Sequence, residues 1–236
     1  MINPIYKRVL IKLSGEGMGN DDTPLAIDTM HRIALEIKKV YELGVEVCLV
    51  IGGGNFWRGA KGVKKGVSRI TGDYIGMLAT MMNALAFADV LKENGMDVRI
   101  MTSLSIEGVG EVFNQEKAER HLQKKRVVIF GGGTGSPFFT TDTCSVLRAS
   151  EMKCDAFLKA TQVDGIYDCD PRINENAQRY DEIDYQTALD KRLGVMDLTA
   201  MAMAQTSKLP VVVFNAHTST FADIVCGQGL YSIMKG

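Results

Sequence analysis

Three times in this chain a short apolar run ends in a glycine-rich loop, and a pattern typical of a helix follows. The runs at 8–13, 45–51 and 126–130 lead into Ser14-Gly15, Gly52-Gly53-Gly54-Asn55 and Gly131-Gly132-Gly133-Thr134-Gly135. In α/β proteins a strand, a glycine loop and a helix often form a phosphate site, because backbone N–H groups can approach an anion where no Cβ intervenes. Ordinary tight turns would use the same glycines, so this pattern leaves both interpretations open.

The rest of the chain continues the alternation of strands and helices. We expect strands at 8–13, 46–51, 98–101, 127–130, 156–159 and 211–214, and helices at 28–43, 73–94, 115–125, 142–152 and 198–207. Such an order predicts an α/β fold, a three-layer αβα sandwich with a mainly parallel central sheet, because each parallel pair needs a crossover. No linker or repeat is visible, so residues 1–236 are expected to form a single domain with two lobes.

Local signals refine these boundaries. Gly44 and Gly95 are placed to end the helices before them, and Asp28 is a candidate N-cap. The stretch 161–184 is rich in Asn, Asp, Gly and Pro and is expected to be a long loop, either a ligand-binding loop or a solvated connection.

Charge and cysteine content narrow the class of protein. A net charge of -1 over 236 residues gives no general attraction to nucleic acid, so no nucleic-acid partner is expected. The five cysteines are scattered and odd in number, which favours a reducing compartment over a disulfide or zinc framework. The first 13 residues lack a signal-peptide core, and the expected location is the cytoplasm.

The apolar segment 73–94 requires a membrane test. Thr80, Asn83 and Asp89 interrupt it, and its unbroken apolar part is shorter than the roughly 20 residues that a bilayer needs. We therefore expect a helix buried in the core or against another subunit, and no membrane association.

Known phosphate motifs do not match directly. No segment supplies the GxxxxGK[ST] pattern of a P-loop, and GxGxxG fails twice, with Trp57 and Ser136 in the place of the third glycine. Lys12 and Lys159 each end a predicted strand, and the carboxyl ends of parallel strands form the ligand crevice of an open sheet. Either lysine alone could simply cap a strand in solvent, whereas two at equivalent places favour one shared anion site.

Further charged residues have two possible interpretations. Arg58 follows the Gly52–Asn55 loop and could clamp a phosphate, whereas Lys61, Lys64, Lys65 and Arg69 are expected to form a solvated basic stretch. Asp73 and Asp142 stand at helix starts, and Asp164 and Asp170 lie in the long loop. Such carboxylates can be helix-dipole partners, or they can bind magnesium or ribose. His31, His121 and His217 form no metal-ligand pattern.

Four segments carry a family resemblance: YKRVLIKLSGE at 6–16, VIGGGNFWRG at 50–59, GDYIGMLAT at 72–80 and GTGSPFFTTD at 133–142. Together with LKAT at 158–161, VDGIY at 163–167 and Asp170-Pro171, they resemble the bacterial UMP kinase (uridylate kinase) family of the amino acid kinase fold over essentially the whole chain. KLSG and GGGN mark the wider fold family, which includes acetylglutamate, aspartate and carbamate kinases. The segments at 72–80 and 134–142 are particular to UMP kinases.

The resemblance implies transfer of the γ-phosphoryl group of ATP to UMP, giving UDP and ADP in pyrimidine nucleotide biosynthesis. It implies Mg²⁺ as cofactor, held mainly through the ATP phosphates with Asp142 as a possible ligand, and a homohexamer. The catalytic residues would be Lys12, Arg58, Asp142 and Lys159. The ATP-binding residues would be Lys12, Leu13, Ser14, Gly15, Gly54, Arg58, Thr161, Tyr167 and Asp170. The UMP-binding residues would be Gly53, Asp73, Thr134, Gly135, Ser136, Pro137, Phe138, Phe139, Thr140 and Thr141.

Two departures from the family and two alternatives accompany this expectation. Ser136 stands where the family commonly has Asn, and residues 16–26 differ from the glycine-rich stretch that is linked to GTP activation in related enzymes, so no GTP activation is assigned. The alternatives are a kinase of the same fold that acts on a carboxylate or carbamate, and a nucleotide-binding regulator without catalysis. The UMP-kinase segments disfavour the first alternative, and the presence of both lysines, Arg58 and Asp142 disfavours the second.

Overall fold

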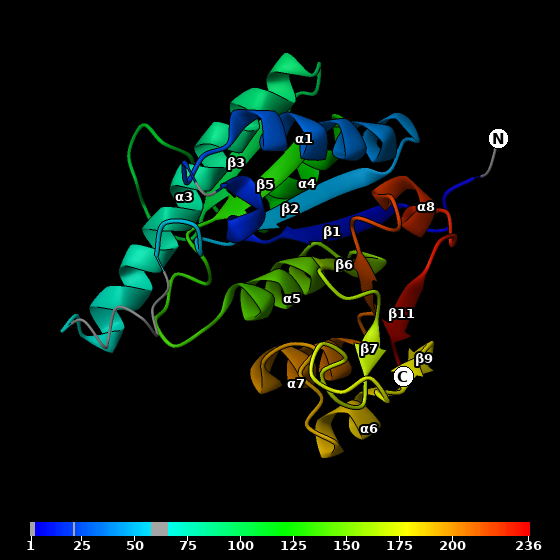
Figure 1. Ribbon diagram of the computed structural model, residues 1–236. Helices are drawn as coiled ribbons and strands as arrows, with labels where there is room; N and C mark the ends of the chain where they lie inside the picture. The colour runs from blue at the N-terminus through cyan, green and yellow to red at the C-terminus, as the bar shows by residue number, and fades with distance from the viewer. Residues whose placement is uncertain (1–2, 21, 58–65) are drawn as a thin grey trace.

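The computed structural model of the protein describes residues 3–20, 22–57 and 66–236, and it has three layers. A central sheet lies between two layers of helices (Figure 1). One layer holds α1 (Ile27–Glu42), α3 (Arg69–Glu93) and α8 (Phe221–Val225), and the other holds α4 (Gln115–Gln123), α5 (Thr141–Glu151), α6 (Tyr185–Asp190) and α7 (Leu198–Ser207). The three-layer αβα prediction is confirmed.

The main sheet has nine strands in the order β4-β3-β5-β2-β1-β6-β10-β11-β9. They are β1 (Arg8–Leu13), β2 (Glu46–Ile51), β3 (Val98–Thr102), β4 (Glu111–Val112), β5 (Val127–Gly131), β6 (Ala156–Thr161), β9 (Glu182–Ile183), β10 (Val211–Asn215) and β11 (Tyr231–Met234). Within the described ranges every neighbouring pair in this sheet is parallel except β10 with β11. A mainly parallel sheet is therefore confirmed.

Alternate residues of β1 show why the sheet is covered on both faces. Val9 and Ile11 pack in the core beneath α1, and Leu10 packs in the core on the α5 side. All three side chains are fully buried, and each contributes about 1.5–3 kcal/mol on removal from water. Apolar residues on both faces are typical of a parallel strand between two helical layers.

The predicted helix boundaries need two corrections. The helix expected to begin at Asp73 begins at Arg69, because the side chain of Ser68 accepts a hydrogen bond from the Thr71 amide and caps it. Asp28 is not an N-cap, since α1 begins at Ile27 and Asp28 lies in its first turn, where a carboxylate favours the helix dipole. The prediction for Gly44 and Gly95 is confirmed, with φ values of 80° and 83° directly after the helices.

The prediction that 161–184 forms a loop was wrong for short parts of it. This stretch contains a small antiparallel sheet of β7 (Ile166–Tyr167) and β8 (Arg179–Tyr180), and it ends with β9. Strands of two residues are too short to show a hydrophobic period, which is why the sequence did not reveal them. The C-terminal β11 and the short helices α6 and α8 also escaped the sequence analysis.

The order of strands places a crevice beside β1. The chain goes from β1 to β2 on one side and later returns to β6 on the other, so β1 lies where the winding direction reverses. Ligands of open α/β sheets bind at such switch points, outside the carboxyl ends of the strands. Lys12 of β1 and Lys159 of β6 are direct register partners at this end.

Helix α3 is long and apolar enough to cross a membrane by length and composition. It spans 25 residues, and 56% of its most apolar window is buried inside the fold. Phe87 and Leu91 of this helix are fully buried in the core beneath α1. A core helix of a globular protein passes the same test, and the packing of α3 gives it that role in this fold.

Candidate active site

Two lysines and one carboxylate form a compact charged centre at the carboxyl ends of β1 and β6. The ammonium group of Lys159 donates to Asp142 Oδ2 at 2.6 Å, and Lys12 Nζ lies 3.3 Å from Asp142 Oδ1. Lys12 and Lys159 face each other across adjacent strands, where like charges repel. Asp142, in the first turn of α5, offsets this repulsion and holds both ammonium groups in one place.

Burial strengthens these charge interactions. The side chains of Lys12 and Asp142 are 15% exposed, and that of Lys159 is 12% exposed. Burial lowers the pKa of Lys159 below its ordinary value, although Asp142 acts in the opposite direction. Burial also acts to raise the pKa of Asp142, but the two ammonium groups outweigh it and hold that pKa below its usual range. Two cations against one carboxylate leave a positive centre that attracts an anion.

The start of α5 is held by Thr140 and by Asp197, and the sequence analysis did not identify Asp197. Thr140 caps α5 by accepting hydrogen bonds from the amides of Asp142 and Thr143. The hydroxyl groups of Thr140 and Thr143 both donate to the carboxylate of Asp197, at 2.5 and 3.0 Å. Asp197 also caps α7 through the Ala200 amide, so one carboxylate joins the two helices. Its place before an apolar helix pattern would have indicated a cap, but not the link to α5.

The glycine loops pack against one another. A Cβ atom on Gly15 would lie 2.4 Å from the carbonyl oxygen of Gly52 and 2.6 Å from the amide nitrogen of Gly54. No other residue fits at Gly15 without displacing the backbone of the second loop. These glycines therefore bring the two strand ends together, besides leaving the backbone open to a ligand.

A cavity of about 490 Å³ opens at the end of β6, and we call it the donor cavity. The three residues predicted to hold adenosine, Thr161, Tyr167 and Asp170, all line it, as does Lys159. Its opposite side is formed by residues 192–195, before α7, which the sequence analysis did not identify. The volume falls in the range of small-molecule sites.

A second cavity of about 270 Å³ lies between α3 and the loop before α5, and we call it the acceptor cavity. The predicted UMP-binding residues that line it are Gly53, Asp73, Ser136, Phe139, Thr140 and Thr141. Gly54, predicted to hold ATP, also lines this cavity rather than the donor cavity. Trp57, the single tryptophan of the chain, forms part of its wall.

Asp73 directly supports the loop 134–141 before α5, which we call the acceptor loop. Its carboxylate accepts hydrogen bonds from the Phe138 amide at 2.7 Å and from Arg69 Nε. Phe138 adopts φ of 74°, a left-handed conformation that costs a non-glycine residue roughly 1–3 kcal/mol and needs such support. Asp73 is therefore more than a dipole partner at the start of a helix.

Some predicted residues take other positions. Thr134, Gly135, Pro137 and Phe138 belong to the acceptor loop but are not among the residues that line its cavity. Leu13 is a core residue, so only its backbone is available to a ligand, and Ser14 is exposed. Arg58, Lys61, Lys64 and Lys65 lie outside the described residues.

A buried arginine supports the acceptor loop from beneath. Arg148 of α5 is 7% exposed, and its guanidinium donates to Ser103 Oγ at 2.8 Å and stacks over the Phe113 ring. Ser103 in turn donates to the carbonyl oxygen of Gly133, which lines the acceptor cavity. An arginine in a helix pattern resembles a solvated residue in sequence, so no sequence signal could have indicated this role.

At the lysine centre, one buried carboxylate oxygen could bind a divalent ion. In the described part of the chain, no group of three or more His, Cys, Asp or Glu side chains could hold a metal by itself. Asp142 Oδ1 is buried, and among the described residues it has the ion pair with Lys12 but accepts no hydrogen bond. Carboxylate oxygens suit Mg²⁺, which is commonly held by one or two carboxylates together with substrate phosphates, so the residues fit a metal–nucleotide complex.

Comparison with known proteins places the chain in a family. The sequence profile of the amino acid kinase family matches residues 7–215. The uridylate kinase of Paramagnetospirillum magneticum is 49% identical over 231 residues, which cover 97% of this chain and 96% of the relative. The chain belongs to the uridylate kinases of the amino acid kinase family.

Solved structures of uridylate (UMP) kinases share the fold of this chain. The UMP kinase of Bacillus anthracis aligns with a TM-score of 0.94 at 39% identity, over 98% of this chain and 96% of that one. The UMP kinase of Ureaplasma parvum aligns with a TM-score of 0.93 at 33% identity, over 98% of this chain and 99% of that one. The expected family and fold are confirmed.

Proposed function

We propose that this chain transfers the γ-phosphoryl group of ATP to UMP at the centre formed by Lys12, Asp142 and Lys159. The observation that carries the proposal is the position of that centre beside two cavities. Lys159 lines the donor cavity, while Thr140 and Thr141, which directly precede Asp142, line the acceptor cavity. Two nucleotides bound in these cavities would present their phosphates to the same pair of lysines.

We assign ATP to the donor cavity and UMP to the acceptor cavity. Thr161, Tyr167 and Asp170 would hold the adenosine part, and the backbone of Ser14-Gly15 and Gly54, together with Arg58, would hold phosphates. Asp73 would accept a hydrogen bond from the UMP ribose, because its carboxylate lies in the wall of the acceptor cavity. The acceptor loop from Thr134 to Thr141 would surround the uracil and the α-phosphate.

Phosphoryl transfer asks for little covalent chemistry from the protein, so positioning and charge neutralisation carry the rate. Lys12 and Lys159 would stabilise the charge that spreads over the γ-phosphoryl oxygens, and Asp142 would hold the two ammonium groups in place. Mg²⁺ supplies further charge neutralisation when it is bound with ATP, with Asp142 Oδ1 as the available protein ligand.

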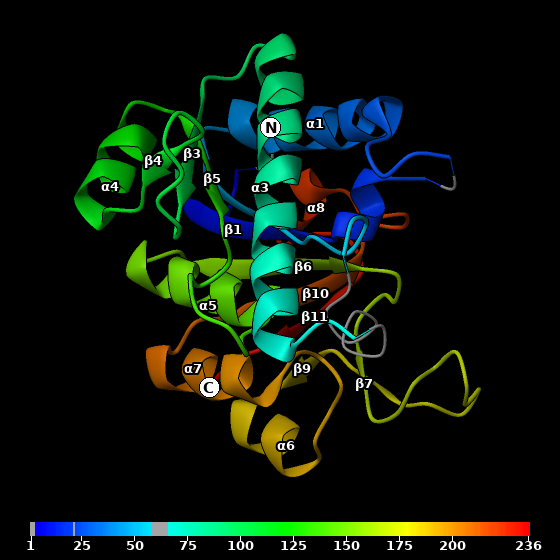
Figure 2. The ribbon, with the colours of Figure 1, turned by 90° about the vertical axis from the view of Figure 1, so that its left-hand side faces the viewer.

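We also propose that the protein works as a homohexamer whose contacts include α3. Four large apolar side chains on α3 remain 40–48% exposed: Tyr74, Leu78, Met82 and Leu85. Their spacing of three or four residues places them on one face of the helix. Figure 2 shows α3 running vertically across the front of the molecule, where another copy could pack against it.

Sedimentation velocity tests the assembly. Leu78→Glu should lower the molecular mass in solution, since a charge within an apolar contact is costly. Ile173→Glu is the control, because Ile173 is exposed in the 161–184 stretch, away from α3. Equal masses for wild type and Leu78→Glu would exclude this face from the subunit contacts.

We place the activity in the cytoplasm, where ATP and UMP are available. In support, no disulfide joins the five cysteines, all of which lie in the described ranges, and Cys48, Cys144 and Cys154 are buried. Thiols in these positions suit a reducing compartment.

The experiment that tests the reaction measures ADP release from ATP and Mg²⁺ with UMP, CMP, AMP, glutamate or carbamate as acceptor. UMP should be much preferred over CMP, because a site built for one base edge leaves polar groups unpaired with the other. Turnover with glutamate or carbamate alone would indicate another kinase of this fold. Nucleotide binding without turnover would indicate a regulator. The Asp142→Asn variant, prepared in parallel, controls for a contaminating kinase.

A further inference from the structure

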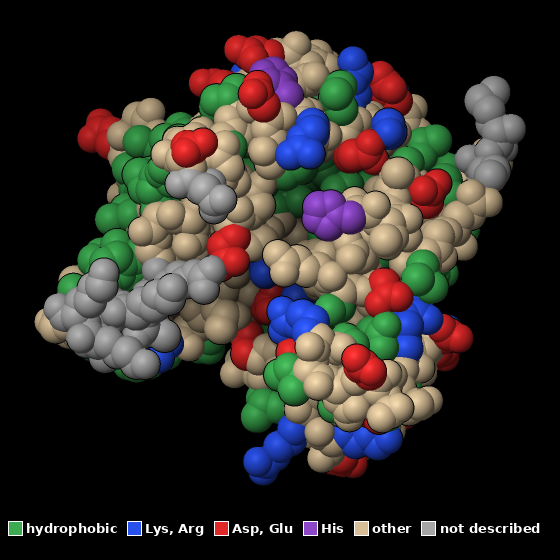
Figure 3. Space-filling model, viewed as in Figure 1, with side chains coloured by type: hydrophobic (Ala, Val, Ile, Leu, Met, Phe, Trp, Pro, Cys, Tyr) green, Lys and Arg blue, Asp and Glu red, His purple; other side chains and the backbone are tan. Residues whose placement is uncertain are grey.

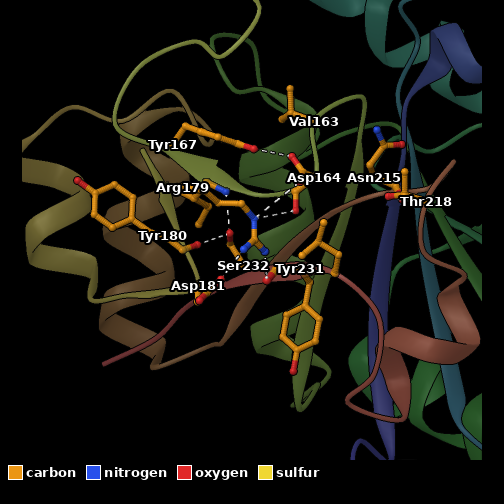
Figure 4. A network of polar contacts seen from close by, with 12 residues as sticks. Val163, Asp164, Tyr167, Arg179, Tyr180, Asp181, Asn215, Thr218, Tyr231 and Ser232 are labelled. Atoms are coloured by element: carbon orange, nitrogen blue, oxygen red, sulfur yellow. Dashed lines mark hydrogen bonds and ion pairs between the residues drawn. The ribbon is translucent and has the colours of Figure 1, made fainter. Parts of the chain in front are cut away.

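The outer wall of the donor cavity is a small hairpin beside the main sheet. Gly165, Ile166 and Tyr167 line the cavity, and the two strands β7 and β8 pair with each other in a separate two-stranded sheet. In Figure 4 this hairpin lies next to β11, the last strand of the chain. Because an isolated two-stranded hairpin is marginally stable, its position depends on what attaches it to β11.

Ser232 of β11 supplies one attachment. This buried hydroxyl accepts a hydrogen bond from the Ile166 amide at 2.8 Å and donates to the carbonyl oxygen of Tyr180. Both strands of the hairpin are therefore tied to one side chain. A Cβ atom on Gly165 would lie 2.3 Å from Ser232 Oγ, so the backbone of the wall rests directly against β11.

Arg179 supplies a second attachment. Its side chain is 18% exposed, and Nη2 donates to the carbonyl oxygen of Tyr231 at 2.5 Å. Nε donates to the carbonyl oxygen of Asp164 at 3.4 Å and lies 4.0 Å from Asp164 Oδ2. On its outer side the guanidinium also pairs with the exposed Asp181. The guanidinium thus spans the distance from β11 to the loop that precedes β7.

Asp164 extends this connection to a residue that lines the cavity. Its Oδ1 accepts a hydrogen bond from the Tyr167 hydroxyl at 2.7 Å, and this bond is the main cause that raises the pKa of Tyr167 above its ordinary value. Figure 4 shows Tyr167, Asp164 and Arg179 in a continuous chain of polar contacts that ends on β11. The orientation of the Tyr167 ring is therefore fixed from β11 through two side chains.

We infer that Asp164 and Arg179 are positioning residues for ATP, because they hold Tyr167 and the hairpin wall in the orientation that the adenosine part requires. The inference rests on the proposed function only in its assignment of ATP to the donor cavity. Loss of either residue should weaken ATP binding while UMP binding and the transfer step keep their wild-type values, because the acceptor cavity and the lysine centre lie on other elements.

Calorimetric titration with ATP alone tests the inference without an acceptor nucleotide. Asp164→Asn and Arg179→Met should raise the Kd for ATP about five- to tenfold, the effect of losing one ordering hydrogen bond. Arg179→Lys, which keeps the charge but loses the planar set of donors, should lie between Arg179→Met and wild type. Asp181→Asn is the matched control. It removes the carboxylate that pairs with Arg179 from the solvent side, and its Kd should stay within about twofold of wild type.

A double-mutant cycle separates positioning from general loosening. If Asp164 acts through Tyr167, then Tyr167→Phe and Asp164→Asn should each weaken ATP binding, and the double variant should be no weaker than the weaker single variant. Additive effects, or an unchanged Kd in Asp164→Asn, would overturn the inference. An equal rise in the KM for UMP would also overturn it. Failure of the proposed function would appear differently, as a wild-type protein that binds ATP but does not phosphorylate UMP.

Discussion

The donor and acceptor cavities are held by different parts of the molecule. The acceptor cavity lies between α3 and the loop from β5 to α5, elements that also form the core. The wall of the donor cavity is a hairpin outside the main sheet, attached through Ser232 and Arg179. Figure 3 shows a hollow between the upper and lower parts of the molecule, with acidic and basic side chains visible in it.

This difference predicts how substitutions behave. The supports of the acceptor loop include two buried side chains, Arg148, which donates to Ser103, and Thr80, which accepts from the Gly132 amide. Their loss should reduce stability and UMP binding together, because buried groups left unpaired are costly. The supports of the donor wall fix a peripheral hairpin, so their loss should affect ATP binding with little change in global stability.

The largest effect is expected at Asp142, which serves both cavities. Asp142→Asn should lower kcat by about 100-fold or more, the scale of losing one preorganised electrostatic group. It should also shift the basic limb of the kcat profile to lower pH. Burial and the charge of Lys12 lower the pKa of Lys159, whereas Asp142 raises it. Removing the Asp142 carboxylate should therefore lower the pKa of Lys159 further. Lys159 would then lose its proton at a lower pH than it does in the wild-type protein.

The kcat of both proteins, measured at saturating nucleotides across neutral and alkaline pH, checks this expectation. Asp28→Asn is the matched control, because Asp28 occupies the same position in the first turn of α1 as Asp142 does in α5. A dipole partner alone contributes roughly 0.3–1 kcal/mol to stability and nothing to kcat. A wild-type kcat in Asp142→Asn would mean that Asp142 is only a partner of the helix dipole.

The two arginines that support the cavities should contribute differently to the free energy of unfolding. Arg148→Met should lower the free energy of unfolding by about 2–3 kcal/mol, because it removes a buried charged group that donates to Ser103 and pairs with Glu151. Arg179→Met should lower it by about 1 kcal/mol, since the hairpin that it holds is peripheral. Urea unfolding of the two variants measures the difference, with Arg120→Met on the exposed face of α4 as control. If Arg148→Met and Arg179→Met lowered the free energy of unfolding equally, the two cavities would not differ in how they are supported.

Asp73→Asn should have a smaller effect in free energy than Asp142→Asn or Arg148→Met. Asp73→Asn should raise the KM for UMP about tenfold, equivalent to about 1.4 kcal/mol, and leave the KM for ATP unchanged. Trp57 gives an independent measurement, because the single tryptophan of the chain lines the acceptor cavity and its fluorescence should change when UMP binds. A fluorescence change with ATP but none with UMP would mean that ATP, and not UMP, binds in the acceptor cavity. Asp89→Asn, at an exposed position of α3, is the control.

The sequence predicted the elements that have a clear hydrophobic period and the residues at their ends. Lys12 and Lys159 could be predicted because each lies near the carboxyl end of a strongly apolar strand, and the carboxyl ends of parallel strands meet at one edge. The contact of Asp142 with both lysines depends on how α5 lies over β1 and β6, which no local pattern encodes. Arg148 and Arg179 escaped notice for a related reason, since a buried arginine and a solvated one look alike in sequence.

The central claim is that Lys12 and Lys159 act on the phosphoryl group during its transfer between the two cavities. The most direct test is a single-turnover rate, measured by rapid quench for Lys12→Ala and Lys159→Ala with both nucleotides saturating. The account predicts transfer at least about 100-fold slower than in wild type although both nucleotides are bound. Transfer at the wild-type rate, with only a weaker affinity for ATP, would contradict it and would limit the lysines to binding the ground state.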